Sequence, residues 1–145
     1  TLYLWWNQLS SLPASFGQLT QLVELNLGLN NFASLPETLF QLTNLQNLNL
    51  SWNKFISLPE NLKWSSKLTE LDLSYNGLAF LPETIGQLTN LQTLNLRSNK
   101  LASLPKTLKQ LIQLTYLDLR GNPDLGDNVR VYSTYETVQA YLTTL

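Results

Sequence analysis

Cysteine, methionine and histidine are all absent from this chain, and charged residues make up only 13% of its 145 residues. A chain without cysteine or histidine can form no disulfide bond, no thiolate or imidazole metal site and no histidine-dependent catalytic site. The formal net charge of -1 gives no general attraction to nucleic acid or to an anionic membrane. No apolar run reaches the roughly 18 residues that a membrane-spanning helix needs. We therefore expect no cofactor, no bound metal, and neither nucleic acid nor membrane as a partner.

What the chain does contain is a period of 23 residues. Asparagine marks this period at Asn7, Asn30, Asn53, Asn76, Asn99 and Asn122. Leucine keeps the same interval at Leu4, Leu27, Leu50, Leu73, Leu96 and Leu119, and proline at Pro13, Pro36, Pro59, Pro82 and Pro105. A fixed period of about 20 to 29 residues is typical of solenoids in which each repeat packs only on its neighbours. Such solenoids usually present binding surfaces, so we expect no enzymatic activity and no catalytic residues.

Each repeat opens with a pattern that predicts one short strand. Leu94 and Leu96 alternate with polar residues, which is the period-2 pattern of a strand with one buried face. Stacked repeats should form a parallel sheet with strands about 4.8 Å apart. Later in each repeat comes Leu-Pro, followed in three of them by Glu, as at Pro82, and both residues favour the first turn of a short helix. The sequence thus predicts an α/β right-handed solenoid, a horseshoe segment with a parallel sheet on the concave face and short helices or 3-10 turns on the convex face.

The period also divides the chain into repeats and a C-terminal segment. Residues 1–122 hold the repeats: a partial repeat 1–21, full repeats 22–44, 45–67, 68–90 and 91–113, and a terminal repeat from 114. Residues 123–145 should form a loop and then a C-terminal cap, because Ser133 to Glu136 match a capping box that starts a helix over about 134–145. The chain begins inside a repeat and without methionine, so we infer a fragment of a longer protein.

The sequence makes specific predictions for two interior positions, the recurring asparagine and the slot at Ser65. Asparagine offers both a donor and an acceptor, so the recurring asparagines should be buried where they satisfy backbone groups at the turn after each strand. Repeat 45–67 departs from the pattern, because Ser65 stands where the other full repeats have leucine. We expect the neighbouring Trp64 to fill that slot, with some local distortion.

The repeat Leu68–Asn90 closely matches the pattern Leu-x-x-Leu-x-Leu-x-x-Asn-x-Leu-x-x-Leu-Pro-x-x-Ile/Leu-x-x-Leu-Thr-Asn. With this pattern the chain resembles the 23-residue typical class of leucine-rich repeat proteins, which includes bacterial and plant intracellular proteins and the repeat arm of Roco-type proteins. The resemblance implies a protein–protein interaction module that binds a protein or peptide partner on the concave face, and a cytoplasmic location. Two other contexts stay open: the sensor or scaffold arm of a larger signalling protein such as a Roco-like GTPase, and a secreted or surface recognition protein of a microbe.

Outward strand positions supply the candidate partner-binding residues. They are Tyr3, Trp5, Trp6, Leu29, Trp52, Tyr75, Asp72, Arg97, Tyr116 and Arg120. Four of them, Trp6, Leu29, Trp52 and Tyr75, follow one another at the strand ends of successive repeats, and exposed apolar patches with Trp, Tyr and Arg mark interaction sites. Two alternatives stay open: the rings cover the strand turns or pack along one another, or preceding repeats cover Trp5 and Trp6.

A polar group lies beside this apolar row. Arg97 and Arg120 stand near Asp72 and Asp118, either to orient a partner that carries carboxylates or, as we favour, to form a cross-strand ladder of ion pairs that neutralises itself. Glu70 and Asp72 are about 7 Å apart by strand rise. An open sheet offers no closed pocket that would raise the pKa of one carboxyl group, so this pair does not indicate catalysis.

Overall fold

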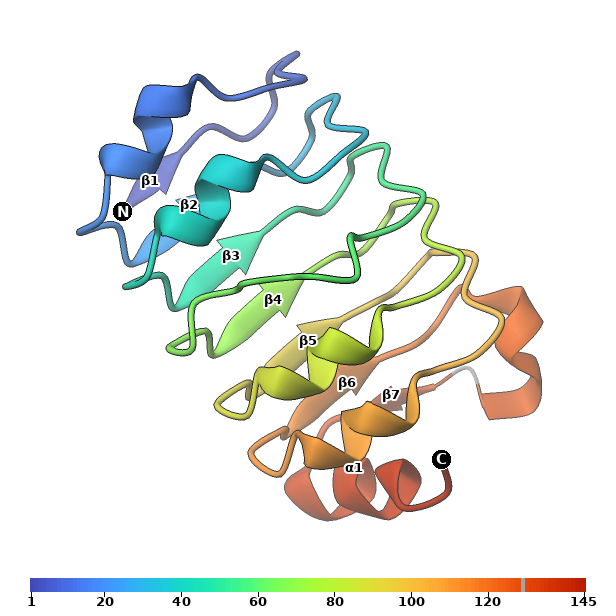
Figure 1. The fold of residues 1–145 in the computed structure, drawn as a ribbon. Helices are drawn as coiled ribbons and strands as arrows, with labels where there is room; N and C mark the ends of the chain where they lie inside the picture. Colours follow the sequence, from blue (N-terminus) through green and yellow to red (C-terminus); the bar gives the residue numbers. More distant parts are fainter. Residues whose placement is uncertain (129) are drawn as a thin grey trace.

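Short strands stacked side by side form one sheet in this protein. The computed structural model describes residues 1–128 and 130–145. Its seven strands follow one another across the sheet in chain order, as Figure 1 shows. They are β1 (Leu2–Tyr3), β2 (Glu24–Asn26), β3 (Asn47–Asn49), β4 (Glu70–Asp72), β5 (Thr93–Asn95), β6 (Tyr116–Asp118) and β7 (Val131–Tyr132). Strands β1 to β6 pair in parallel, and β7 returns antiparallel to β6.

The register of the sheet equals the period of the sequence. Leu25, Leu48 and Leu71 are direct partners on adjacent strands, so each repeat places its central strand leucine beside the preceding one. These leucines are buried, whereas the residues on either side of them, such as Glu24 and Asn26, keep part of their surface in solvent. A column of leucines therefore runs the length of the solenoid, and the predicted fold class is confirmed.

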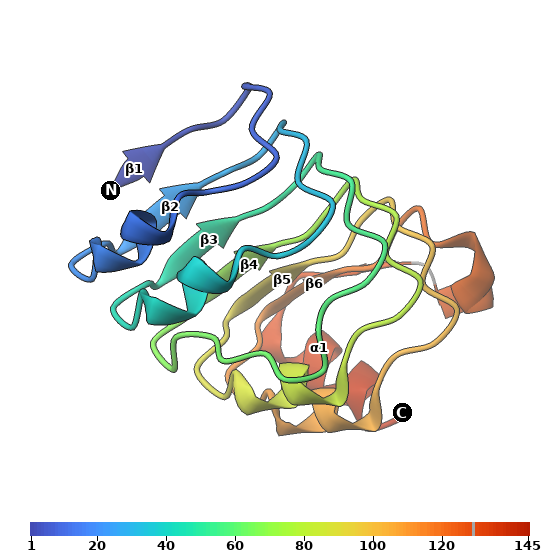
Figure 2. The ribbon, with the colours of Figure 1, turned by 45° about the horizontal axis from the view of Figure 1, so that its top comes forward.

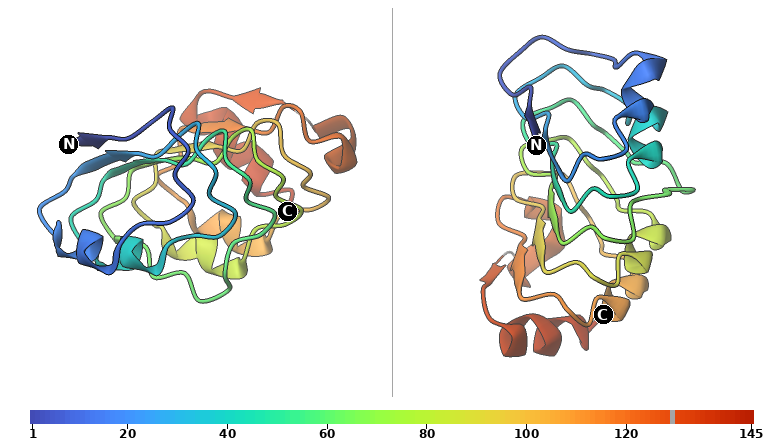
Figure 3. Two further views of the ribbon diagram at one scale, coloured as in Figure 1. Left: turned by 90° about the horizontal axis from the view of Figure 1, so that it is seen from above. Right: turned by 90° about the vertical axis from the view of Figure 1, so that its left-hand side faces the viewer.

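The face opposite the sheet carries short 3-10 helices. Within the repeats they are Ala14–Gln18, Glu37–Gln41, Glu83–Gln87 and Lys106–Gln110. Each follows a proline with extended backbone, such as Pro82 before Glu83, which agrees with the predicted helix start. In the right-hand view of Figure 3 the helices lie along one side of the molecule and the strands along the other, and Figure 2 shows the same two layers.

Repeat 45–67, which the structure describes throughout, has no 3-10 helix between β3 and β4. The local distortion expected here is therefore confirmed. Ser65 itself is buried, and its hydroxyl donates a hydrogen bond to the carbonyl oxygen of Thr43 at 3.0 Å. Trp64 lies beside this slot, half-buried, with its ring edge-on to Phe40 at a centroid distance of 6.2 Å. Ser65 thus takes the leucine position with its own backbone partner, and the Trp64 ring packs against the core beside it.

The recurring asparagine bonds each repeat to the one before it. In Asn99 the side-chain nitrogen donates to the carbonyl oxygens of Leu96 and Leu73, both at 3.0 Å. Its side-chain oxygen accepts the backbone N–H of Leu78, also at 3.0 Å. The same arrangement recurs at Asn30, Asn53, Asn76 and Asn122. The asparagines therefore satisfy interior backbone groups, as their chemistry predicts.

A helix covers the core at the C-terminal end. Helix α1 (Tyr135–Leu142) buries Val138, Tyr141 and Leu142, and it ends earlier than predicted. Its N-cap is Thr134, whose hydroxyl accepts the backbone N–H of Thr137 at 3.3 Å. The capping box was therefore predicted one residue too early. The segment predicted as a loop contains the 3-10 helix Pro123–Asn128, and strand β7 was not predicted.

Candidate interaction surface

The residue before each asparagine has a left-handed backbone. Its φ angle is 57° at Trp6, 54° at Leu29 and Trp52, 53° at Tyr75 and 56° at Ser98. This conformation costs an L-residue about 1–2 kcal/mol, and glycine is its usual occupant. Glycine stands there in the terminal repeat, where Gly121 has φ 73°. Four successive repeats instead carry large apolar side chains, Trp6, Leu29, Trp52 and Tyr75, which we call the apolar row.

Two rings of the apolar row stack on each other and remain accessible. The centroids of Trp52 and Tyr75 are 4.0 Å apart, and the ring planes differ by 9°. Trp52 is nevertheless 51% exposed. The guanidinium carbon of Arg97 lies 5.7 Å from the Tyr75 centroid, a distance at which a cation is attracted to a ring face. The structure thus brings Trp52, Tyr75 and Arg97 together, and the rings both pack along one another and face solvent.

A second aromatic group lies at the N-terminal end of the sheet. The rings of Trp5 and Trp6 are stacked with centroids 6.0 Å apart, and Trp6 is 74% exposed. The Tyr3 hydroxyl donates to Glu24 Oε1 at 2.9 Å, and this hydrogen bond raises the pKa of Tyr3. Leu29, which is 40% exposed, is the residue of the apolar row between Trp6 and Trp52.

The last residue of each strand from β2 to β6 is Asn or Asp, and it has a structural role that the sequence analysis missed. The side-chain Oδ1 of Asp72 accepts the backbone N–H of Ser74 at 2.8 Å. The same bond, to the N–H two residues on, recurs at Asn26, Asn49, Asn95 and Asp118. The signal was visible in the sequence, because Asn and Asp commonly bond the backbone two residues ahead at turns. One lateral bond also joins two of these residues, from Asn95 Nδ2 to Asp72 Oδ2 at 3.1 Å.

The predicted cross-strand ladder of ion pairs is not what the structure shows. In the described residues 1–128 and 130–145 the one salt bridge joins Arg120 Nη2 to Asp118 Oδ2 at 2.6 Å, two residues apart in one repeat. Burial raises the pKa of Asp118, but hydrogen bonds from Arg120 outweigh burial, so the pKa lies below its usual value. The Tyr116 hydroxyl donates to Asp118 Oδ2 at 3.4 Å. Arg97 does not join this group through a salt bridge and turns to Tyr75 instead.

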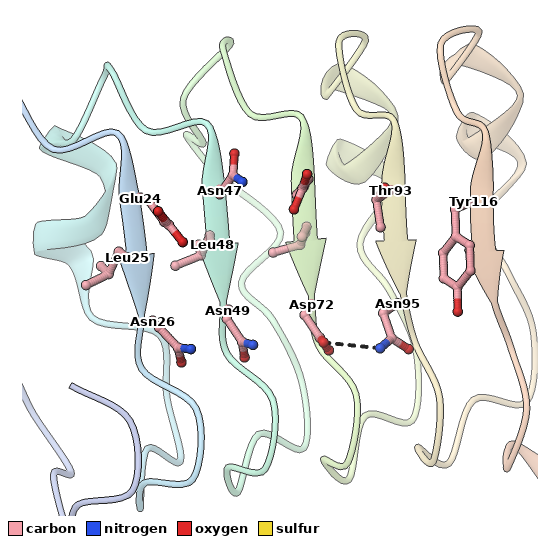
Figure 4. A pocket seen from close by; sticks show the side chains of 12 residues that line it. Glu24, Leu25, Asn26, Asn47, Leu48, Asn49, Asp72, Thr93, Asn95 and Tyr116 are labelled. Carbon is pink, nitrogen blue, oxygen red and sulfur yellow. Dashed lines mark hydrogen bonds between the residues drawn. The ribbon is translucent and has the colours of Figure 1, made fainter. Parts of the chain in front are cut away.

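A shallow hollow of about 230 Å³ lies on the strand surface beside these residues. Its polar lining comes from β2 to β6, and Figure 4 shows Glu24, Asn49, Asp72 and Tyr116 around it. Exposed Glu70 adds a further carboxylate to this lining. Two residues after the ends of β2, β3 and β4 stand the small buried residues Gly28, Ser51 and Ser74. Exposed Trp5 takes this position after β1, and Arg97 and Arg120 take it after β5 and β6.

The described residues contain no group of three or more His, Cys, Asp or Glu side chains that could hold a metal ion. None of the helices in the part of the chain that the structure describes is long and apolar enough to cross a membrane. What the strand surface offers is therefore ring faces, amides and carboxylates, which are groups suited to noncovalent recognition.

Comparison with known proteins agrees with the architecture. A family model described as leucine rich repeat matches residues 1–55 and 66–123, well over half of the chain. The chain belongs to the leucine-rich repeat family. The unmatched stretch includes most of the second half of repeat 45–67, where the 3-10 helix is missing. A search of curated proteins gave no match.

Solved structures of leucine-rich repeat proteins are similar to this one. A leucine-rich repeat protein of Leptospira interrogans is 41% identical with a TM-score of 0.71 over 75% of this chain and 28% of that chain. The leucine-rich repeat domain of the type III effector XopL has a TM-score of 0.68 over 85% of this chain and 52% of that chain. Its 23% identity shows a shared fold only. This chain thus spans about a quarter and about half of the lengths of the two proteins.

Membership of the family gives a general statement about function. Leucine-rich repeat domains are commonly protein–protein interaction modules and are typically not enzymes.

Proposed function

We propose that this leucine-rich repeat segment recognises an extended segment of a protein or peptide on its concave face, with the apolar row as the main contact. The observation that carries the proposal is the occupancy of the left-handed turn position. Four successive repeats place Trp, Leu, Trp and Tyr where the backbone favours glycine. Strained backbone of this kind is often found at binding sites.

Exposure and packing support the same surface. Trp6, Leu29 and Trp52 are each at least 40% exposed, although large apolar side chains gain free energy by leaving water. Trp52 is also held in one orientation by the stack with Tyr75. A ring that is already ordered loses little side-chain entropy when a partner binds, which is the property of binding hot spots.

The test is a selection of peptides from a displayed library of random dodecamers, because the partner is unknown. Wild type, Trp52→Ala/Tyr75→Ala and Lys63→Ala serve as targets, and Lys63 lies exposed on the convex side. We expect peptides selected on wild type to bind the Lys63→Ala variant equally. We expect them to lose at least about tenfold in affinity for the double variant, as hot-spot truncations do.

The control is thermal unfolding of all three proteins. Because both rings lie at the surface, the double variant should remain folded at the temperature of the binding assay. Peptides that bind all three proteins equally would contradict the proposal, because contact would then lie away from the apolar row.

A further inference from the structure

The surroundings of Asp72 repeat the backbone bond of Asp118 but differ in their side-chain donors. Asn95 Nδ2 donates to Asp72 Oδ2 at 3.1 Å, whereas Tyr116 and Arg120 donate to Asp118. In both repeats the aspartate Oδ1 accepts the backbone N–H two residues on, at 2.8 Å from Ser74 and 3.0 Å from Arg120. The two carboxylates therefore have the same backbone setting. Arg120 also donates from Nε and Nη2 to both oxygens of Asp118. At the equivalent position Asp72 has Ser74, and among the described residues no lysine or arginine lies within salt-bridge distance of it.

Beside Asp72 the chain has a small residue where the next two repeats have arginine. Ser74 is 3% exposed, and the preceding repeats have Ser51 and Gly28 at the same position. The next two repeats fill that position with Arg97 and Arg120. Of these two arginines, Arg97 contacts the ring face of Tyr75 and Arg120 contacts the carboxylate of Asp118.

The charge of the N-terminal half also favours a cation. Glu24, Glu70 and Asp72 line the hollow together. In the described residues 1–96 no lysine or arginine occupies an outward strand position. Uncompensated carboxylates on a shared surface attract and orient a positively charged partner.

We infer that Asp72 receives an arginine side chain from an extended peptide partner, in the place that Arg120 takes beside Asp118. The guanidinium donates two parallel N–H groups to the carboxylate, a geometry that lysine cannot supply. Its methylene groups lie against the edge of the Trp52–Tyr75 stack, as long cationic side chains do on apolar surfaces. This inference rests on the proposed function and adds the chemical class of the partner.

The test is a double-mutant cycle on a peptide from the selection described above. In the peptide, arginine is replaced by citrulline, which keeps the shape and loses the charge. In the protein, Asp72→Asn keeps the acceptor for Ser74, because asparagine makes the same bond in three other repeats. We expect each change alone to weaken binding about tenfold and the two together to weaken it no further.

A second variant places the chain's own cation in the site. Ser74→Arg should pair with Asp72 as Arg120 pairs with Asp118, and it should weaken binding of the arginine peptide at least as much as Asp72→Asn does. Because Ser74 is buried, binding by this variant is compared at a temperature at which its thermal unfolding curve shows that it is folded. Glu60→Gln, an exposed carboxylate on the convex side, serves as the matched control and should bind like wild type.

The possible failures are distinguishable. Selected peptides that need Trp52 and Tyr75 but contain no arginine, or that bind equally with citrulline, would overturn the inference and leave the proposed function standing. A selection without any peptide that depends on Trp52 and Tyr75 would overturn both.

Discussion

The two halves of the concave face share one backbone and differ in what occupies it. Between residues 22 and 90, the small buried residues Gly28, Ser51 and Ser74 lie beside bulky members of the apolar row. From residue 91 onward the pattern is reversed, with Arg97 and Arg120 beside the small residues Ser98 and Gly121. The first half therefore offers accessible rings and unpaired carboxylates, whereas the second half fills the same space with its own arginines.

This difference separates the residues that build the fold from those that give each repeat its surface. The asparagines make the same hydrogen bonds in both halves, and each strand from β2 to β6 has a buried central leucine, so these residues do not distinguish one half from the other. The positions next to them vary freely, because their side chains point away from the core. A solenoid can thus change its recognition chemistry from repeat to repeat without changing its fold.

The largest expected effect on stability comes from the recurring asparagines, which both halves share. Replacing Asn53 or Asn99 by leucine removes two donated bonds and leaves the N–H of Phe32 or Leu78 without an acceptor. We expect each variant to lose roughly 3 kcal/mol in free energy of unfolding, measured by urea denaturation. Asn7→Leu, at an exposed asparagine, should lose much less. Unequal losses at Asn53 and Asn99 would show that the two halves differ in the core as well.

A smaller effect is expected from the ion pair that only the second half contains. The pKa of Asp118 is lowered in the folded protein, so its charge stabilises the fold above the unfolded pKa of about 3.9. That contribution is lost as the pH falls through the lower folded value. Asp118→Asn should therefore be less stable than wild type by about 2 kcal/mol at pH 7.

The difference between wild type and Asp118→Asn should shrink below pH 4, which urea denaturation across the acid range would measure. Asp72→Asn is the matched control, because Asp72 has no arginine beside it among the described residues. Its free energy of unfolding at pH 7 should differ little from that of wild type. An Asp118→Asn deficit that stays constant down to pH 2 would contradict the role of the ion pair.

The smallest expected effect is a gain in the free energy of unfolding. Ser98→Gly should raise the free energy of unfolding by up to about 1 kcal/mol, because glycine adopts φ 56° without the cost to an L-residue. Trp52→Gly also removes the strain of an L-residue at positive φ, but it loses a ring stack worth about 0.5–1.5 kcal/mol. The net change in its free energy of unfolding should therefore be near zero. The difference between the two, measured in urea, isolates the contribution of the ring. A destabilised Ser98→Gly variant would contradict the left-handed turn.

The period of 23 residues was sufficient to predict the parallel sheet, the buried asparagines and the 3-10 helices, because each depends on contacts between neighbouring repeats. In repeat 45–67 the sequence predicted the distortion but not the hydrogen bond from Ser65 to Thr43, because that bond depends on side-chain conformation. Strand β7 depends on pairing with β6 across a long connection, which has no local pattern.

At the candidate surface, the sequence placed Trp52 and Tyr75 in one row but could not show their stacking. It also gave no sign that Arg97 would turn to a ring rather than to a carboxylate, because that choice depends on side-chain conformation. The glycine at Gly121 was the one visible indication that this position needs a left-handed backbone. The binding role of these residues and the cytoplasmic location remain predictions.

The residues of the apolar row are regularly spaced, and this spacing selects the peptides that can contact several of them. Neighbouring residues of the row are one strand spacing apart, about 4.8 Å, so Trp6 and Trp52 are two strand spacings apart, or about 9.6 Å. An extended peptide in the polyproline II conformation advances about 3.1 Å per residue with three residues per turn, so side chains three apart face the same way and lie about 9.3 Å apart. Every third side chain of such a peptide would therefore contact every second residue of the apolar row. A peptide with its contact residues at every third position would match this spacing, whereas a peptide with its contact residues at every second position would not.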